Sequence, residues 1–254
     1  MIKKLAKEVL IWIWILNGHF DRYFTIDIKQ KVTVIIPSYS IERVKHVEPQ
    51  VRSLLKCDFV AKIIVSNHNS ELLIEDWVKI KDARLTLINQ PTRRGCGYGW
   101  IVASNANPEF LISIDDDLLI FPAQLAKLFT QLVEQPEVPH GYTGRLNSKY
   151  YQNQEMEVDN LLQIYAVTGT HLRKYLELVE VITSHNYSSY ESIEFWANDI
   201  LISQTGTKKT IIHNLGFLLR CPTANEPGVA TYKNEEFQQR RIEVQAALEK
   251  VKLT

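Results

Sequence analysis

The sequence predicts an α/β domain in which a mostly parallel central sheet is flanked by helices. Two observations carry this prediction: four short apolar segments rich in β-branched residues lie in the first half of the chain, and segments with helical spacing separate them. Strand and helix in alternation are typical of a parallel sheet with covered faces. The chain has 254 residues, of which 45% are hydrophobic, so it can bury one large core.

The four predicted strands are mostly apolar, and the first runs without a polar face, which indicates burial on both sides of a sheet. They are residues 31–37, 61–66, 85–89 and 110–114. Apolar side chains at helical spacing follow the first strand, at Val51, Leu54 and Leu55, and a second helix is expected near residues 101–105.

Polar side chains follow each of these strands. They are Ser38 and Tyr39, Asn67 and Asn69, Arg93 and Arg94, and the three aspartates Asp115, Asp116 and Asp117. In open α/β sheets, ligands bind beyond the carboxyl ends of the strands. We therefore expect the four polar groups to line one crevice.

The second half of the chain has a less regular pattern. Pro122, which suits the first turn of a helix, begins a segment with apolar side chains at helical spacing. Further helices are expected at 172–181, 192–203 and 235–252, and strands or turns at 141–145, 161–168 and 210–212. The last of these helices is charged and amphipathic.

The charge balance excludes one class of partner. The chain has 29 basic and 29 acidic side chains, whereas a nucleic-acid partner demands a basic face. Its cysteines, Cys57, Cys96 and Cys221, match neither a paired metal-ligand spacing nor a disulfide framework. We therefore expect no nucleic-acid partner and a reducing, cytoplasmic location.

Residues 1–30 are predicted to form an N-terminal apolar segment, and residues 31–254 a single domain. Lys3, Lys4 and Lys7 precede an apolar run at residues 9–16. This run is too short to span a bilayer, which takes about 17–25 helical residues, and no small-residue cleavage site follows it. Two interpretations remain open: peripheral contact with a membrane interface, or packing on the domain.

Three adjacent aspartates, Asp115–Asp117, directly follow the fourth strand. Carboxylates this close repel one another unless a cation or strong hydrogen-bond donors compensate. Mg²⁺ and Mn²⁺ prefer oxygen ligands and commonly bridge to substrate phosphates. Alternate residues of a strand point to opposite sides, so Asp115 and Asp117 are expected to face one site while Asp116 has another role. An acidic turn that caps the helix beginning near Pro122 is the alternative interpretation.

The order of several motifs along the chain resembles a known family. Residues 35–39 (Ile-Ile-Pro-Ser-Tyr) end a strand, and an Asp-any-Asp cluster follows about 80 residues later. Further motifs in the same order are 63–67, 141–145, 168–177 and 198–200. Together they resemble the GT-A glycosyltransferases, and most closely the exostosin type, the enzymes of heparan-sulfate synthesis. The resemblance covers residues 31 to 235 and implies a Rossmann-like nucleotide-diphospho-sugar transferase of the hexosyltransferase type.

The resemblance implies a binding site for a nucleoside-diphosphate sugar, with uridine as the expected nucleoside. Pro37, Ser38 and Tyr39 would line the nucleotide base. Asn67 would hydrogen-bond the uracil or the ribose, and Arg43 would approach the diphosphate.

Further residues are assigned to the same donor site. Asp115 would face the ribose and the donor sugar, Asp117 would hold Mn²⁺ or Mg²⁺, and Asp116 is grouped with the nucleotide-sugar-binding residues. Residues 93–99 replace an Asn/Arg-rich segment of the family. Arg94 could still supply charge to the phosphates, and the glycines of this segment would let backbone amides approach the substrate.

The acceptor and the chemistry are assigned to the second half of the chain. Asp199 is the expected catalytic carboxylate: it would either orient the acceptor and steady positive charge at the anomeric carbon, or act as base for the incoming hydroxyl. The family has two adjacent acidic residues here, and this chain has Asn198 in place of one of them. Tyr142, Arg145 and Gly169 are expected on the acceptor side.

The expected reaction is metal-dependent transfer of a sugar from a UDP-sugar to a hydroxyl of a glycan or another acceptor, with retention of configuration. A lone carboxylate is equally what an inverting enzyme requires, and a catalytically inactive sugar-nucleotide-binding homologue is a further alternative. A nucleotidyltransferase shares the sheet but carries a Gly-rich turn and a Lys after the first strand, and residues 37–40 have neither. His213 is either a further metal ligand or an ordinary surface or core histidine.

Overall fold

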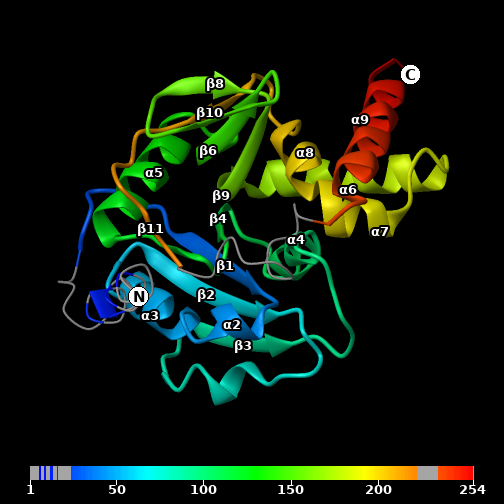
Figure 1. Cartoon of the computed structure of the whole chain (residues 1–254). Helices are drawn as coiled ribbons and strands as arrows, with labels where there is room; N and C mark the ends of the chain where they lie inside the picture. Colours follow the sequence, from blue (N-terminus) through cyan, green and yellow to red (C-terminus); the bar gives the residue numbers. More distant parts are fainter. Residues whose placement is uncertain are drawn as a thin grey trace.

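The structure, a computed structural model, describes residues 24–221 and 234–253, together with Ala6, Val9, Trp12, Ile13 and Leu16. It has three layers, with helices on both faces of one large sheet (Figure 1). A second, small sheet pairs β5 (Leu118–Leu119) with β11 (Leu219–Arg220). Most of the predicted N-terminal segment lies outside the described residues.

The large sheet has nine strands in the order β3-β2-β1-β4-β9-β6-β10-β8, with β7 paired to β6. Their bounds are β1 Val32–Ser38, β2 Val60–Asn67, β3 Leu85–Asn89, β4 Phe110–Ile114, β6 His140–Leu146, β7 Lys149–Gln152, β8 Met156–Val158, β9 Asn160–Thr168 and β10 Thr210–Ile212. The first four strands in this order pair in parallel, as the sequence predicts.

The prediction of a mostly parallel sheet was wrong for the second half, and the sheet is mixed. β9 runs antiparallel between β4 and β6, and β7 and β8 are antiparallel to their neighbours. β6 and β10 run in the direction of β4 and pair in parallel with each other. The physical reason is the short connection after β6: only Asn147 and Ser148 separate β6 from β7, and a short turn can join only antiparallel strands. β8 and β9 then run in the same direction as β7.

The helices pack on the sheet in two groups. Their bounds are α2 Ile41–Val44, α3 Val47–Leu55, α4 Tyr98–Ser104, α5 Pro122–Glu134, α6 Gly169–Ser184, α7 Tyr190–Ser192, α8 Asn198–Ser203 and α9 Phe237–Leu253, with a 3₁₀ turn η1 at Ile74–Asp76 and a π-helical turn η2 at Ile193–Ala197. Successive side chains of β1 face opposite layers: Val34 and Ile36 pack with α3 and α5, whereas Ile35 packs with α4, α6, α8 and α9.

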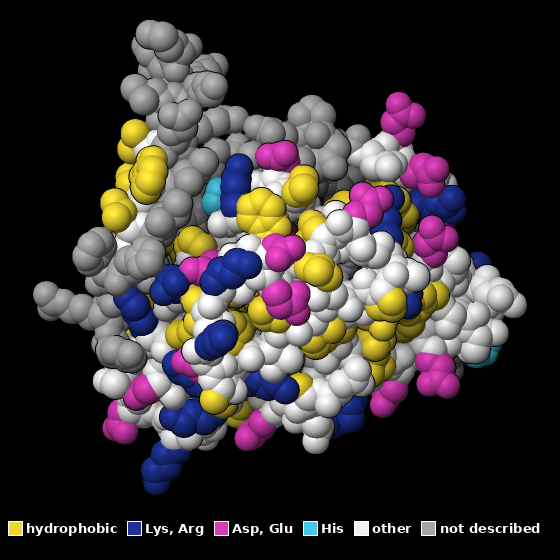
Figure 2. Space-filling model, turned by 90° about the horizontal axis from the view of Figure 1, so that it is seen from below, with side chains coloured by type: hydrophobic (Ala, Val, Ile, Leu, Met, Phe, Trp, Pro, Cys, Tyr) yellow, Lys and Arg dark blue, Asp and Glu magenta, His cyan; other side chains and the backbone are white. Residues whose placement is uncertain are grey.

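Four apolar side chains of the N-terminal segment are exposed. Val9, Trp12, Ile13 and Leu16 are helical in conformation and 41–63% exposed, and Figure 2 shows a row of hydrophobic side chains at the edge where this segment lies. Among the described residues, no helix is both long and apolar enough to cross a membrane. Contact with a membrane interface stays a prediction.

Candidate active site

The aspartate cluster lies at the carboxyl end of β4, directly beside the end of β1. Asp116 and Asp117 are 4% and 5% exposed, and Asp115 is half-buried. Ser38, the last residue of β1, donates a hydrogen bond of 2.9 Å to Asp116. The cluster is therefore mostly buried at the carboxyl ends of two central strands and is not an acidic turn on open surface.

The backbone of the cluster is held from two sides. On one side, α3 supplies Gln50, whose amide donates to the carbonyls of Asp115, at 3.2 Å, and of Leu118. On the other side, the amide of Asp115 donates to the carbonyl of Gln163 in β9 at 2.9 Å. These bonds fix where the three carboxylates point.

Arg43 compensates part of the charge of the cluster. Its guanidinium lies 3.2 Å from Asp116 and 3.4 Å from Asp117. The sequence assigned Arg43 to the diphosphate, but the structure pairs it with carboxylates, since a guanidinium satisfies two neighbouring oxygens at once. The charge of Asp116 is thus balanced within the protein, and a role of Asp116 separate from those of Asp115 and Asp117 stays a prediction.

Asp115 and Asp117 are poorly compensated. Burial raises the pKa of Asp117 to about 6, against the opposing charge of Arg43. Burial, together with Asp117 and Asp116, raises the pKa of Asp115 well above its usual range. One buried oxygen of Asp117, Oδ1, has no hydrogen-bond partner among the described residues. Both side chains therefore present carboxylate oxygens that a divalent cation would satisfy.

The donor set fits a cation that binds few protein ligands. Within the described part of the chain, no three His, Cys, Asp or Glu side chains are grouped to hold a metal ion. Mg²⁺ is commonly bound through one or two carboxylates, with water and substrate phosphates as the other ligands. Asp115 and Asp117 fit that arrangement, whereas a site made of protein ligands alone does not.

His213 is not placed to complete such a site. It follows β10, which lies three strands from β4 in the sheet, or about 14 Å at the usual strand spacing. Its ring is 2.8 Å from the ring of His140, and both side chains are buried. The interpretation as an ordinary core histidine is the one that the structure supports.

Asp199 forms a buried ion pair that the sequence analysis missed. Arg241 of α9 contacts both of its oxygens, at 2.5 Å and 2.8 Å, and also donates to the carbonyl of Trp196 at 2.8 Å. Neither partner is more than 7% exposed. Because both oxygens accept hydrogen bonds from a fixed cation, the geometry favours a role in positioning over removal of a proton.

The residues expected around the nucleotide base lie close together, but the side chain of Asn67 is hydrogen-bonded within the protein. Ser38 pairs with Asn67 in the parallel register of β1 and β2. The amide of Asn67 already donates to Leu72, at 2.7 Å, and to Asn89, at 2.9 Å. Asn67 thus has no donor left for a uracil, and its observed role is to fasten the loop after β2. Pro37 precedes Ser38 in the same strand and is half-buried.

The ring of Tyr39 is partly covered. Tyr39 is 36% exposed, and the guanidinium of Arg93 lies 5.0 Å from the centre of its ring. The same guanidinium lies 5.7 Å from the ring of Phe195 in η2. A base that stacks on Tyr39 on this side would have to displace Arg93.

Arg94 points to η2 and not to the aspartates. It lies 3.8 Å from the buried Glu194 and 4.3 Å from the ring of Tyr98. The amide of Gly95 donates to the carboxylate of Glu194 at 2.7 Å. The glycine segment is therefore used here for close packing against η2.

We expect Gly95→Ala to destabilise the protein by about 1–3 kcal/mol, the usual cost of overpacking. A β-carbon at Gly95 would meet the Glu194 carbonyl oxygen at 2.5 Å and the Phe195 α-carbon at 2.8 Å, and neither backbone atom can move alone. Gly99→Ala is the matched control, because its nearest contact, Pro37, is at an ordinary 3.6 Å. Denaturant unfolding of both variants tests this, and equal stability would contradict it.

The three residues expected on the acceptor side do not lie together. Tyr142 and Arg145 lie in β6, and the carbonyl that braces Asp115 belongs to the neighbouring β9. Gly169 lies at the other end of the sheet, where its amide donates to the carbonyl of Glu109 at 2.9 Å. Six residues of extended chain, about 20 Å, separate Glu109 from Asp115, so Gly169 is not part of the aspartate site.

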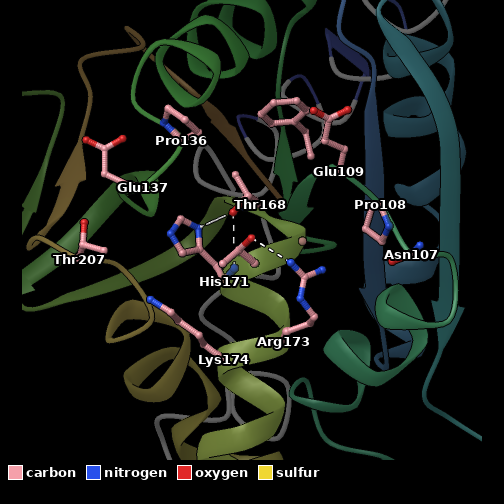
Figure 3. A pocket seen from close by; sticks show the side chains of 13 residues that line it. Asn107, Pro108, Glu109, Pro136, Glu137, Thr168, His171, Arg173, Lys174 and Thr207 are labelled. Carbon is pink, nitrogen blue, oxygen red and sulfur yellow. Dashed lines mark hydrogen bonds between the residues drawn. The ribbon is translucent and has the colours of Figure 1, made fainter.

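Gly169 instead lines a separate pocket, shown in Figure 3. The pocket has a volume of about 620 Å³ and is bordered by the start of β4, the loop after α5 and the first turns of α6. Its charged lining is mixed, with Glu109 and Glu137 opposite Arg173 and Lys174 (Figure 3). This pocket lies away from the aspartates and takes no part in the site described here.

Three residues near the aspartates had no signal in the sequence analysis. Arg220 of β11 donates to Gln163 at 2.7 Å and to the hydroxyl of Tyr150 at 2.5 Å. Gln163 has a φ of +68°, a conformation that no sequence pattern predicts for glutamine. We call Arg220, Tyr150 and Gln163 the Arg220 cluster.

Comparison with solved structures identifies the fold. No protein-family model matches the chain, and no curated protein matches it. A crystal structure of GalNAc-T7 with UDP, GalNAc and Mn²⁺ matches with a TM-score of 0.55 and 12% identity, over 74% of this chain and 42% of that one. S. aureus TarS 1–349 in complex with UDP-GlcNAc matches with a TM-score of 0.51 and 17% identity, over 74% of this chain and 57% of that one. The fold is that of the GT-A glycosyltransferases.

At these identities the likeness concerns the GT-A fold alone. The chain spans about half the length of the two matched structures. The closer resemblance to the exostosin type stays a prediction.

Proposed function

We propose that this protein is a glycosyltransferase that moves a sugar, of the hexosyl type, from a UDP-sugar to a hydroxyl of a glycan or another acceptor. The observation that carries the proposal is the pair Asp115 and Asp117, which is undercompensated at the carboxyl end of β4 and includes one buried, unpartnered oxygen among the described residues. Two solved proteins of the same fold hold UDP or UDP-GlcNAc. A diphosphate with a divalent cation is the ligand that would relieve this repulsion.

Asp117 and Asp115 are the residues that would hold Mg²⁺ or Mn²⁺. The ion would supply a Lewis acid that neutralises the charge of the departing diphosphate. The chain itself fixes the carboxylates: Arg43 and Ser38 orient Asp116, and Gln50 holds the backbone of the loop.

Asp199 would position the acceptor beside the donor sugar. Its orientation is set by Arg241, and its negative charge contributes, after burial and the neighbouring aspartates, to the raised pKa of Asp115. The two carboxylates would act on one bound pair of donor sugar and acceptor. Retention of configuration remains the expectation from the family resemblance, and inversion is the alternative.

We expect UDP to raise the melting temperature, and Mn²⁺ to increase that shift, because a ligand that binds only the folded state stabilises it by mass action. A thermal-shift series with UDP, Mn²⁺ and both together tests this. Asp117→Ala should abolish only the metal-dependent part. No shift with any nucleoside diphosphate would rule out the proposed function, and a shift without turnover of UDP-sugars would identify an inactive binding homologue.

A further inference from the structure

We infer that Arg220 is the residue that binds the diphosphate of the donor, and that Tyr150 and Gln163 hold its guanidinium for that purpose. The inference rests on the proposed function and deepens it. It moves phosphate recognition from Arg43 and Arg94, where the sequence analysis placed it, to a residue that the sequence analysis did not identify.

Arg220 is fixed beside the aspartates by backbone pairing. It pairs with Leu118 across the small sheet of β5 and β11. The amide of the next residue, Cys221, donates to the carbonyl of Asp117 at 2.7 Å. Arg220 is therefore held one residue from the point where the chain after β11 is hydrogen-bonded to the aspartate cluster.

The other arginines around the site already have a carboxylate partner. Arg43 is paired with Asp116 and Asp117, Arg94 with Glu194, and Arg241 with Asp199. Arg220 has none within 4.0 Å among the described residues, and its guanidinium donates to a neutral phenol and a neutral amide. These neutral partners orient Arg220 but leave its positive charge uncompensated.

The backbone around Gln163 is built to hold this arrangement. The pairing of β6 with β9 shifts register between Gly141 and Thr143, which leaves one extra residue in β9. Gln163 lies in this bulge and has a φ of +68°. Bulges and left-handed non-glycine residues concentrate at functional sites, where they redirect a side chain. Here the carbonyl of Gln163 braces Asp115 while its side chain braces Arg220.

The ligand that fits between these groups is a diphosphate. Guanidinium N–H groups form a planar fork that matches phosphate oxygens. Arg220 and Asp117, both in the described part of the chain, form no ion pair within 4.0 Å. A diphosphate bound to a metal ion on Asp117 would bring phosphate oxygens toward the guanidinium of Arg220. A neutral sugar would leave the charge of this guanidinium uncompensated.

The test compares the affinities of uridine, UMP and UDP by calorimetry in the presence of Mn²⁺. For Arg220→Gln we expect UDP affinity to fall about 10- to 100-fold, the range for a lost hydrogen bond to a charged group, and uridine affinity to stay within about twofold. Arg220→Lys keeps the charge but loses the fork, so its UDP affinity should be intermediate. Arg94→Gln is the matched control and should keep the preference for UDP over uridine.

Each other outcome has a defined meaning. Unchanged UDP affinity in Arg220→Gln, or an equal loss for uridine and UDP, would overturn the assignment of Arg220 and leave the proposed function standing. The assignment of Arg220 would also be overturned if Arg94→Gln lost the higher affinity for UDP over uridine while Arg220→Gln kept it. A wild-type protein that binds none of the three ligands, uridine, UMP and UDP, would instead overturn the proposed function, and the assignment of Arg220 with it.

Discussion

Arg241→Met should destabilise the protein by about 3–5 kcal/mol, the range for removing one partner of a buried ion pair. The substitution keeps the length of the side chain but leaves the carboxylate of Asp199 buried without a cation. It also removes the donor to the carbonyl of Trp196. Since Arg241 is in α9 and Asp199 in α8, this pair links the C-terminal helix to the site, in addition to the apolar packing of Val244 and Leu248. Urea unfolding of the variant measures the loss.

Two comparisons show whether the buried charge is the cause. Arg240→Met removes the neighbouring arginine, whose partners Glu236 and Glu243 are in the same exposed stretch, and should change stability little. Adding Asp199→Asn to Arg241→Met removes the unpaired charge and should recover part of the loss, because an unpaired buried charge costs more than an absent pair. If Arg240→Met and Arg241→Met unfold alike, the ion pair does not hold α9.

Arg241 shows how a site residue could have been found from the sequence. Phe237, Arg241, Val244 and Leu248 are spaced three or four residues apart in the charged C-terminal segment and so lie on one face of a helix. Phe237, Val244 and Leu248 are all buried in the structure. A charged residue in the middle of an apolar face indicates a buried partner of opposite charge. The identity of that partner, 42 residues earlier, is beyond local patterning.

The first half of the fold was readable because local pattern and tertiary environment agree there. The predicted bounds of residues 85–89 and 110–114 match β3 and β4. β4 is buried at every position, and a strand buried on both faces is mostly apolar, whereas β3 is the half-buried strand at the edge of the sheet. The antiparallel course of β9 was not readable. Its apolar residues would suit either direction, and the direction depends on turns of few residues after β6.

The partners within the site were the least predictable part. The sequence placed Ser38, Asp115 and Asp117 at strand ends, and the structure brings those ends to one edge of the sheet. It could not show that Arg43 would pair with Asp116, because nothing in the spacing distinguishes a carboxylate from a phosphate as the partner of a guanidinium. It also could not show that the donors of Asn67 are used within the loop after β2.

Asp117→Asn should stabilise the ligand-free protein by about 2–3 kcal/mol at pH 7, whereas Asp116→Asn should destabilise it by about 1–3 kcal/mol. The two residues are adjacent and both buried, but burial raises the pKa of Asp117 to about 6, so its ionised form costs folding free energy. Asp116 accepts hydrogen bonds from Ser38 and Arg43, which the substitution weakens. Urea unfolding with a chelator present gives both differences.

The pH dependence separates charge repulsion from a packing effect. Between the unfolded value of 3.8 and about 6, the folded wild type binds more protons than the unfolded chain at Asp117, so the contribution of this residue to stability falls as pH rises through that window. The gain in Asp117→Asn should accordingly be complete above pH 7 and about half as large at pH 5. A gain that does not change with pH would contradict this explanation, because a carboxylate destabilised by its neighbours is relieved by a proton as well as by a cation. The same repulsion that lowers the stability of the empty site is what a metal-bound diphosphate would relieve on binding.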